Sequence, residues 1–308
     1  MLSCFGRLPV HNDTTEMDID TGLVRQLIES QFPQWSDLPI RPVKRSGWDN
    51  RTFRLGDDFV VRMPSAERYV WQVQKEQTWL PLLSTNLSVP IPCVVAEGRP
   101  EFGYLWPWSV YRWIEGEDLN EPTNQTLDRN ELAGSVGRFL KDLHRQDASG
   151  GPIPGQKNFF RGGSLQHYDV DTRLYIDSLT DIIRSEIALS VWNKALATSW
   201  QADSVWVHGD LEPGNILVHE KKLAGVIDFG GCAVGDPACD LVMAWTYFDV
   251  LSREHFRETL NLDNDTWDRG KAWALWKALF RMMNAKDQRS DEYFSAKRIV
   301  DLVCSVSA

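Results

Sequence analysis

Three short apolar runs between residues 205 and 231 constrain the fold of this chain more than any other stretch of its sequence. The runs are residues 205–207, 216–218 and 223–227. Each run is rich in β-branched residues and too short for a stable helix, so each one predicts a β-strand. Polar residues stand where these strands end, and loops at strand ends often carry catalytic groups. We therefore expect the chemistry of the protein to lie here.

Two carboxylates and one carboxamide stand beside these runs. Asp210 follows the first run, Asn215 precedes the second, and Asp228 follows the third. The intervening hairpin has the length needed to return Asp228 to the end where the other two lie, so we expect the three side chains around one small volume. Hard oxygen ligands of this kind suit Mg²⁺, and an acid near the metal can act as a base toward a hydroxyl group.

The same residues form two motifs. Residues 208–215 read His-Gly-Asp-Leu-Glu-Pro-Gly-Asn, and residues 228–230 read Asp-Phe-Gly. Together they match the pattern His-x-Asp-Leu-x-x-x-Asn followed by Asp-Phe-Gly, which resembles the catalytic loop and the metal loop of kinases. The glycine at 209 and the Pro-Gly pair at 213–214 make the chain similar to the aminoglycoside phosphotransferase family. The alternative is a plain β-hairpin with acidic turns.

The resemblance implies a bilobal, protein-kinase-like α+β fold. An N-terminal five-stranded antiparallel sheet with helices would be followed by a mostly helical C-terminal lobe that carries the catalytic β-hairpin. The resemblance also implies transfer of the γ-phosphoryl group of ATP or GTP to a hydroxyl of a small molecule. Asp210 would be the catalytic base, and Asn215 and Asp228 would hold Mg²⁺. The same family pattern serves aminoglycosides, macrolides, choline, homoserine and sugars, so the acceptor remains open.

Five strand-like segments predict the N-terminal sheet, and they lie at residues 40–44, 52–55, 59–63, 89–96 and 108–114. Residues 1–17 have no periodic apolar pattern and are expected to be a loose tail, and a helix capped by Asp20 or Thr21 follows them. By resemblance, the loop before the second strand would cover the nucleotide phosphates. Ser46, Gly47 and Asn50 are its candidate residues, although a hairpin turn explains this loop nearly as well.

Arg62 stands on the third strand, where kinases place a phosphate-binding lysine. Arginine keeps the charge and can hold phosphate in a bidentate manner, but it is bulkier. Glu76 lies beside the apolar stripe of the next predicted helix, and pairing with Arg62 would give it a partner. A surface arginine and a solvated glutamate are the alternatives. Pro81 is expected to end or kink that helix.

A polar segment beginning at Glu115 marks the boundary between two lobes. We predict a nucleotide-binding small lobe over residues 18–114, a hinge over residues 115–121, and a catalytic and substrate-binding helical lobe over residues 122–308. By resemblance, the backbone at Arg112 and Ile114 would contact the adenine.

The second lobe shows helical patterns on both sides of the two motifs. Asp236 before Pro237 predicts a helix start, and by resemblance Asp240 braces the backbone of the catalytic loop. Residues 150–163 form a loop rich in Gly and Pro that is long enough to shape an acceptor pocket. The other helical segments are residues 132–143, 168–197, 265–284 and 291–303.

Charge limits the partners of the chain. The net charge of −10 argues against nucleic acid and against an anionic membrane. Residues 1–115 contain 12 Lys and Arg against 14 Asp and Glu, which leaves 21 against 29 in the remainder. The acidic second half would suit a cationic acceptor such as an aminoglycoside, although a solvated acidic surface explains it equally well.

Cysteine usage and hydropathy indicate a cytoplasmic protein, expected as a monomer or weak dimer. The five cysteines contain no Cys-x-x-Cys pair. No apolar run has membrane-spanning length, and the N-terminus lacks the charged-then-apolar pattern of a signal peptide.

Two other functions are compatible with parts of this sequence. A metal-dependent phosphoesterase has similar Gly-Asp and Gly-Asn elements, but it needs an upstream Asp-x-His motif that is not found before residue 205. A nucleotide-binding protein without turnover would tolerate Arg62 and the reduced phosphate loop. The intact Asp210, Asn215 and Asp228 favour an active kinase over both.

Overall fold

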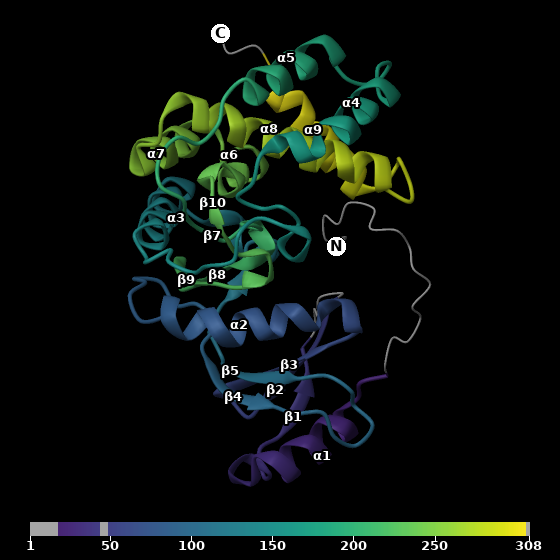
Figure 1. Ribbon diagram of the computed structural model, residues 1–308, viewed down its shortest axis with the longest axis vertical. Helices are drawn as coiled ribbons and strands as arrows, with labels where there is room; N and C mark the ends of the chain where they lie inside the picture. Colours follow the sequence, from purple (N-terminus) through teal and green to yellow (C-terminus); the bar gives the residue numbers. More distant parts are fainter. Residues whose placement is uncertain (1–17, 44–48, 306–308) are drawn as a thin grey trace.

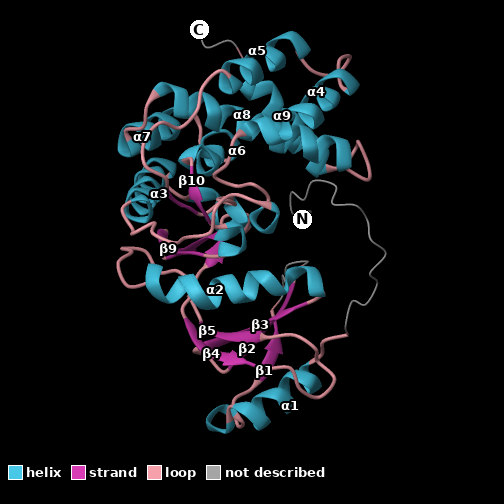
Figure 2. Ribbon diagram, viewed as in Figure 1, coloured by secondary structure: helices cyan, strands magenta, loops and turns pink. Residues whose placement is uncertain are grey.

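The computed structural model describes residues 18–43 and 49–305 and divides them into two lobes (Figure 1). A sheet with its flanking helices forms the smaller lobe, and the larger lobe is mostly helical (Figure 2). The predicted N-terminal tail and the candidate residues Ser46 and Gly47 lie outside the described residues.

The small lobe is a five-stranded antiparallel sheet with the strand order β1-β2-β3-β5-β4, as predicted. Helix α1 (Thr21–Gln31) begins at Asp20, whose carboxylate accepts a hydrogen bond from the Leu23 N–H at 2.8 Å. Buried residues of α1, β2, β3 and β5 form one apolar core. The strands are β1 (Ile40–Pro42), β2 (Asn50–Leu55), β3 (Phe59–Pro64), β4 (Val94–Gly98) and β5 (Trp108–Arg112).

Helix α2 (Val70–Leu83) lies between the sheet and the helical lobe (Figure 2). The helix does not end at Pro81 but runs on to Leu83. The helix continues for two residues because Leu80 and Leu83 are buried in the core of the large lobe, and the Ser84 N–H still donates to the Leu80 carbonyl at 2.9 Å. These two leucines anchor α2 on the large lobe.

The large lobe places the three apolar runs in two small sheets. The first run, β7, pairs with β10, whereas β8 and β9 form a hairpin that β6 extends. The predicted hinge therefore contains a strand, because β6 pairs with β8 inside the large lobe. The strands are β6 (Glu117–Asp118), β7 (Val205–Val207), β8 (Ile216–His219), β9 (Lys222–Val226) and β10 (Ala233–Gly235).

Helices surround these sheets, and α8 is the most deeply buried of the long ones, with 14 of its 21 residues buried. The helical segments predicted from the sequence are all present. Nowhere in residues 18–43 and 49–305 is there a helix with the length and apolar character needed to cross a membrane. The helices are α3 (Arg129–His144), α4 (Asp169–Ser178), α5 (Ser185–Leu196), α6 (Met243–Thr246), α7 (Val250–Leu260), α8 (Asn264–Asn284) and α9 (Asp291–Val303).

Candidate active site

Asp240 holds the backbone that leads into the catalytic loop. The N–H groups of His208 and Gly209 each donate to a different oxygen of its carboxylate, both at 2.7 Å. Asp240 is fully buried, and this burial raises its pKa even though the two N–H groups and His208 oppose the shift. The bracing role predicted for Asp240 is confirmed as a contact. Asp236 also caps its helix as predicted, by accepting from the Ala238 N–H at 3.0 Å.

Glycine is required at position 209. Its φ of +81° lies in the left-handed region, and a Cβ there would come within 2.3 Å of the Gly231 carbonyl oxygen. The catalytic loop and the loop after Asp228 therefore approach each other more closely than a residue with a side chain would allow.

A network of hydrogen bonds joins the ends of the three strand segments. The Asn215 side-chain amide donates to the Asp210 carbonyl at 2.8 Å, and the Ile227 N–H donates to the Asn215 carbonyl at 2.9 Å. His208 completes the network, because its Nδ1 accepts from the Asp210 N–H at 3.2 Å and its Nε2 lies 2.9 Å from the Ile227 carbonyl. These contacts assign the Nε2–H tautomer to His208. They also leave the amide oxygen of Asn215 as the atom that can coordinate a metal.

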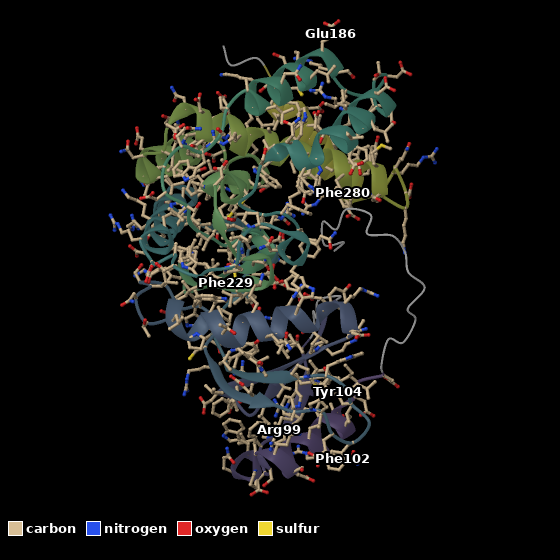
Figure 3. All side chains as sticks on the ribbon, viewed as in Figure 1. Arg99, Phe102, Tyr104, Glu186, Phe229 and Phe280 are labelled. Carbon is tan, nitrogen blue, oxygen red and sulfur yellow. The ribbon has the colours of Figure 1, made fainter. Side chains whose placement is uncertain are left out.

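Asp228 begins the metal loop in a left-handed conformation, with φ of 67° and ψ of 68°. A non-glycine residue in this region carries backbone strain, which is common at functional sites. The next residue, Phe229, is fully buried and lies beside α2 in the labelled view (Figure 3). Its ring contacts the His208 ring with centroids 4.6 Å apart. The buried Phe229 side chain thus fixes the backbone directly after the strained Asp228.

Arg62 of the small lobe lies among carboxylates and pairs with Glu76 and Asp228. Its guanidinium is 3.1 Å from Glu76 and 3.6 Å from Asp228, so the predicted pairing of Arg62 with Glu76 is confirmed. Tyr111 donates its hydroxyl to the second oxygen of Glu76 at 2.5 Å. Burial opposes the charge on Arg62, but Glu76 and Asp228 raise its pKa above the ordinary value. Burial and the nearby Asp228 raise the pKa of Asp49 to about 6.

Three acids, Asp49, Glu76 and Asp228, interact electrostatically with Arg62, and two of them also interact with Lys75. In the part of the chain that the structure describes, the acids outnumber these two cations, which is compatible with a divalent cation on this side. Among the described residues, no group of three or more His, Cys, Asp or Glu is arranged to hold a metal ion. Asn215 and Asp228 form a smaller set of two protein oxygens. A set of this size fits Mg²⁺, which keeps several waters and takes further oxygens from substrate phosphates.

The remaining candidate residues lie at or just beyond the ends of strands β2 and β5. Asn50 is buried at the start of β2, opposite Pro64. The Arg112 N–H donates to the Cys93 carbonyl at 2.9 Å, so this group is already used within the small lobe. Ile114 is half-buried and lies close to Gly225 of β9. The structure therefore places Arg112 and Ile114 where the chain passes from the small lobe to the large one.

Two cations that were not predicted from the sequence lie on the other side of Asp210. Lys277 approaches Asp210 at 2.6 Å and Glu212 at 2.5 Å, and Arg281 approaches Glu212 at 2.5 Å. Burial would raise the pKa values of both carboxyl groups, but the cations lower them; for Asp210 the pKa falls well below its usual range. Glu212 lies near Asp210, as expected, but both of its oxygens face cations.

One sequence signal points to this arrangement. Lys277 interrupts a strongly apolar part of α8, Trp-Ala-Leu-Trp-Lys-Ala-Leu-Phe at residues 273–280. A charged residue on an otherwise buried face needs an ionic partner. The periodicity indicates that a partner exists, but it cannot identify residues 65 to 67 positions earlier in the chain as that partner.

The loop over residues 150–163 also contributes a cation. Arg161 is buried and lies over the rings of Trp273 and Trp276, at 5.2 and 5.1 Å from their centroids. After Lys277, it is the next cation that lowers the pKa of Asp210. This long loop therefore influences the electrostatic environment of Asp210 through Arg161.

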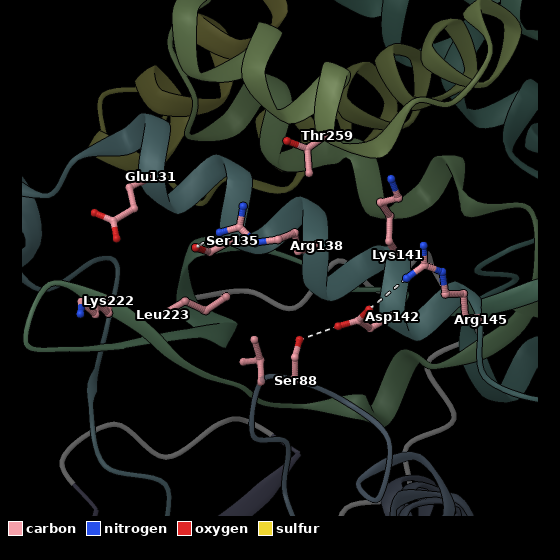
Figure 4. Close-up of a pocket in the computed structure, with 11 residues that line it drawn as sticks. Ser88, Glu131, Ser135, Arg138, Lys141, Asp142, Arg145, Lys222, Leu223 and Thr259 are labelled. Atoms are coloured by element: carbon pink, nitrogen blue, oxygen red, sulfur yellow. Dashed lines mark hydrogen bonds and ion pairs between the residues drawn. The ribbon is translucent and has the colours of Figure 1, made fainter.

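A cavity of about 550 Å³ lies elsewhere, between α3, α7 and β9 (Figure 4). Its walls include Arg138, Lys141 and Lys222 together with the acidic Glu131 and Asp142. None of the candidate site residues lines it. The chemistry predicted from the sequence therefore lies outside this cavity.

Comparison with known proteins agrees with this architecture. The family model described as the phosphotransferase enzyme family matches residues 40–273. No curated protein sequence matches the chain significantly.

Several solved structures resemble the fold. The GDP complex of an aminoglycoside 2'-phosphotransferase IIIa mutant has a TM-score of 0.72 at 20% identity, covering 92% of this chain and 97% of that one. A macrolide 2'-phosphotransferase of type I has a TM-score of 0.60 at 19% identity, with coverages of 94% and 99%. A macrolide 2'-phosphotransferase from Brachybacterium faecium has a TM-score of 0.58 at 20% identity, with coverages of 86% and 94%.

At these identities the solved structures establish the bilobal kinase-like fold alone. The family model carries the assignment further because it spans most of the sequence, including both motifs. The chain belongs to the phosphotransferase enzyme family and is an enzyme of the small-molecule kinase type.

Proposed function

We propose that this protein transfers the γ-phosphoryl group of ATP or GTP to a hydroxyl of a small molecule in a Mg²⁺-dependent reaction. One observation carries the proposal. The hydrogen bonds among His208, Asp210, Asn215 and Ile227 bring the base candidate and both metal-ligand candidates to one end of two small sheets.

Asp210 is the catalytic base in this proposal. Lys277 holds one of its carboxylate oxygens, so the other oxygen is the one that would accept a hydrogen bond from the acceptor hydroxyl. The transition state of phosphoryl transfer is loose, so orientation of this hydroxyl matters more than strong basicity. The low pKa of Asp210 is compatible with a base that takes up the proton late in the transfer.

Asn215 and Asp228 would hold Mg²⁺ between the loop and the phosphates. When bound, the metal would neutralise charge on the transferring group. Arg62 would contact the phosphates while Glu76 and Tyr111 keep its position. We assign nucleotide binding to residues 18–114. Asn50 would lie near the phosphates, and the backbone near Arg112 and Ile114 would lie near the adenine. Residues 115–121 would be the hinge, and residues 122–308 the catalytic and acceptor-binding lobe.

Ligands bound in related solved structures support the nucleotide and the kind of acceptor. One relative is an aminoglycoside phosphotransferase with ADP bound, and another is in complex with GDP and kanamycin. Others carry gentamicin or streptomycin, and two are macrolide phosphotransferases. We propose a hydroxyl-bearing small molecule of this general kind, or another small metabolite, as the acceptor.

A coupled assay of nucleotide turnover tests the proposal directly. ATP and GTP are supplied with Mg²⁺, and aminoglycosides, macrolides, amino alcohols and sugars are tested as acceptors, with mass spectrometry of the product. A phosphorylated product from any acceptor, lost when EDTA removes the metal, is the expected result. Tight Mg·ATP or Mg·GTP binding without product from any acceptor would favour a nucleotide-binding protein without turnover.

A further inference from the structure

Four charged side chains form a continuous chain of ion pairs on the acceptor side of the catalytic loop. They alternate in sign in the order Asp210, Lys277, Glu212, Arg281, and the successive N···O distances are 2.6, 2.5 and 2.5 Å. We call these four residues the ion-pair chain. Its acids belong to the catalytic loop, and its cations lie one helical turn apart on α8.

The ion-pair chain is balanced and largely shielded from water. It contains two carboxylates and two cations, and the Lys277 side chain is only 5% exposed. Burying an ammonium group costs several kcal/mol unless ionic partners compensate for the lost hydration. Lys277 therefore stays in place because both carboxylates hold it.

This arrangement changes what the two acids can bind. An ammonium group on an acceptor gains affinity next to a carboxylate only if no other cation already occupies that carboxylate. Here Lys277 contacts one oxygen of Asp210, and Lys277 and Arg281 contact the two oxygens of Glu212. An ammonium group would have to displace a cation to reach Glu212, and at the second oxygen of Asp210 it would lie beside an acid whose charge Lys277 already compensates. Arg161 adds further positive potential at Asp210.

We propose that Lys277 and Arg281 are specificity-determining residues that exclude ammonium groups from the space beside Asp210. The acceptor is then a hydroxyl compound that is uncharged around its reacting hydroxyl, such as a polyol or a sugar ring without amino groups. The inference rests on the proposed phosphotransfer at Asp210 and narrows the acceptor class for that reaction. The overall acidity of the second lobe does not decide the charge of the acceptor, because these particular acids are already neutralised.

The test measures the binding affinity of kanamycin, used as a polycationic probe. Kanamycin is titrated calorimetrically into the full-length protein loaded with Mg²⁺ and ADP or GDP. Arg281 is the safer position to alter because its side chain is 23% exposed. We expect R281M to bind kanamycin at least ten-fold more tightly than the wild type, since it frees one oxygen of Glu212. The gain should disappear at high salt, and R281K, which keeps the charge, should match the wild type.

Lys277→Met should increase kanamycin affinity further if the variant folds, which circular dichroism establishes. Lys271→Met is the matched control, because Lys271 lies on the same helix but pairs with none of the four residues; it should bind kanamycin as the wild type does. Equal kanamycin affinity in R281M and wild type, or tight and salt-sensitive binding by the wild type itself, would overturn the inference.

Mg·ADP and Mg·GDP affinities are measured in the same samples, so that failure of the proposed phosphotransfer can be distinguished from failure of the proposed exclusion of ammonium groups. Absence of nucleotide binding in the wild type contradicts the proposed phosphotransfer. The change in kanamycin affinity between R281M and R281K reports only on the ion-pair chain.

Discussion

The two sides of the catalytic centre differ in how their acids are balanced. On the proposed nucleotide side, Asp49, Glu76 and Asp228 interact with Arg62, and Glu76 and Asp228 also interact with Lys75. On the proposed acceptor side, Asp210 and Glu212 pair with Lys277 and Arg281. Among the described residues, the first side has three acids against two cations, and the second has two of each.

This difference in charge indicates which kind of ligand each side would favour. The excess of carboxylate on the first side would suit a divalent metal, which by our proposal is brought with the nucleotide. The acceptor side needs no charge from its ligand, because its cations come from α8. Similar acidic residues thus have two proposed roles, metal binding on one side and ion pairing with α8 on the other. The cations packed around each acid in the folded protein determine which role it has.

The largest expected effect separates the two aspartates. D210N should lower phosphoryl transfer by roughly 100- to 10,000-fold, the usual range for loss of a general base, while Mg·nucleotide affinity stays near that of the wild type. D228N should instead weaken Mg·nucleotide binding, because it removes a proposed metal ligand. Turnover and nucleotide titration of both variants check this. Loss of nucleotide binding in D210N would break the division into two sides.

Removal of the guanidinium that pairs with Glu76 should destabilise the small lobe. R62M leaves the buried Glu76 carboxylate without its cation, and breaking a buried pair in this way costs about 3–5 kcal/mol. Urea denaturation measures the free energy of unfolding. R62K keeps a positive charge near Glu76 and should recover most of the loss. An R62M variant as stable as the wild type would show that Arg62 balances no acid there.

Loss of the Asp240 brace should have an intermediate effect. D240N keeps one acceptor oxygen but turns an amide group toward the second loop N–H, so one charge-assisted hydrogen bond is lost. Such bonds contribute about 1.5–3 kcal/mol each. The turnover number should fall more than nucleotide affinity does, because the brace holds the acceptor side of the loop. D249N, at the start of α7, is the control and should leave the turnover number unchanged.

The smallest effect is a difference in pH dependence between the two sides, measured in metal-free buffer. The folded-state pKa of Glu212 is lowered from 4.5, so its contribution to stability is complete above that pH and is lost as the pH falls. The pKa of Asp49 is raised from 3.8 to about 6, so the unfolded state loses this proton first and stability falls as the pH rises between those values.

Urea denaturation across this pH range should therefore give opposite changes for two variants. E212Q should lose less stability than the wild type on acidification below 4.5, and D49N should remove the decline between 3.8 and about 6. Changes of the same sign in both variants would contradict the assigned difference between the two sides.

Local sequence patterns were sufficient for much of the fold and part of the site. The strands of the five-stranded sheet, the β8–β9 hairpin, and the caps at Asp20 and Asp236 were all predictable, because apolar periodicity and short motifs specify such features within a few neighbouring residues. The Arg62–Glu76 pair followed from the resemblance to kinases. Of the two outcomes expected at Pro81, an end of α2 is not found, because burial of Leu83 in the other lobe outweighs the local cost of proline within the helix.

The sequence by itself determined the reaction type, because one short stretch contains the base, the metal-ligand candidates and the glycine that its loop requires. Only the tertiary structure decided the electrostatic state of that stretch. The sequence shows that Asp210 and Glu212 are acids. It does not show their partners, because Lys277 and Arg281 of α8 lie more than sixty residues further along the chain. Ionic interactions depend on distance and burial, and neither quantity for such a remote pair can be read from local sequence.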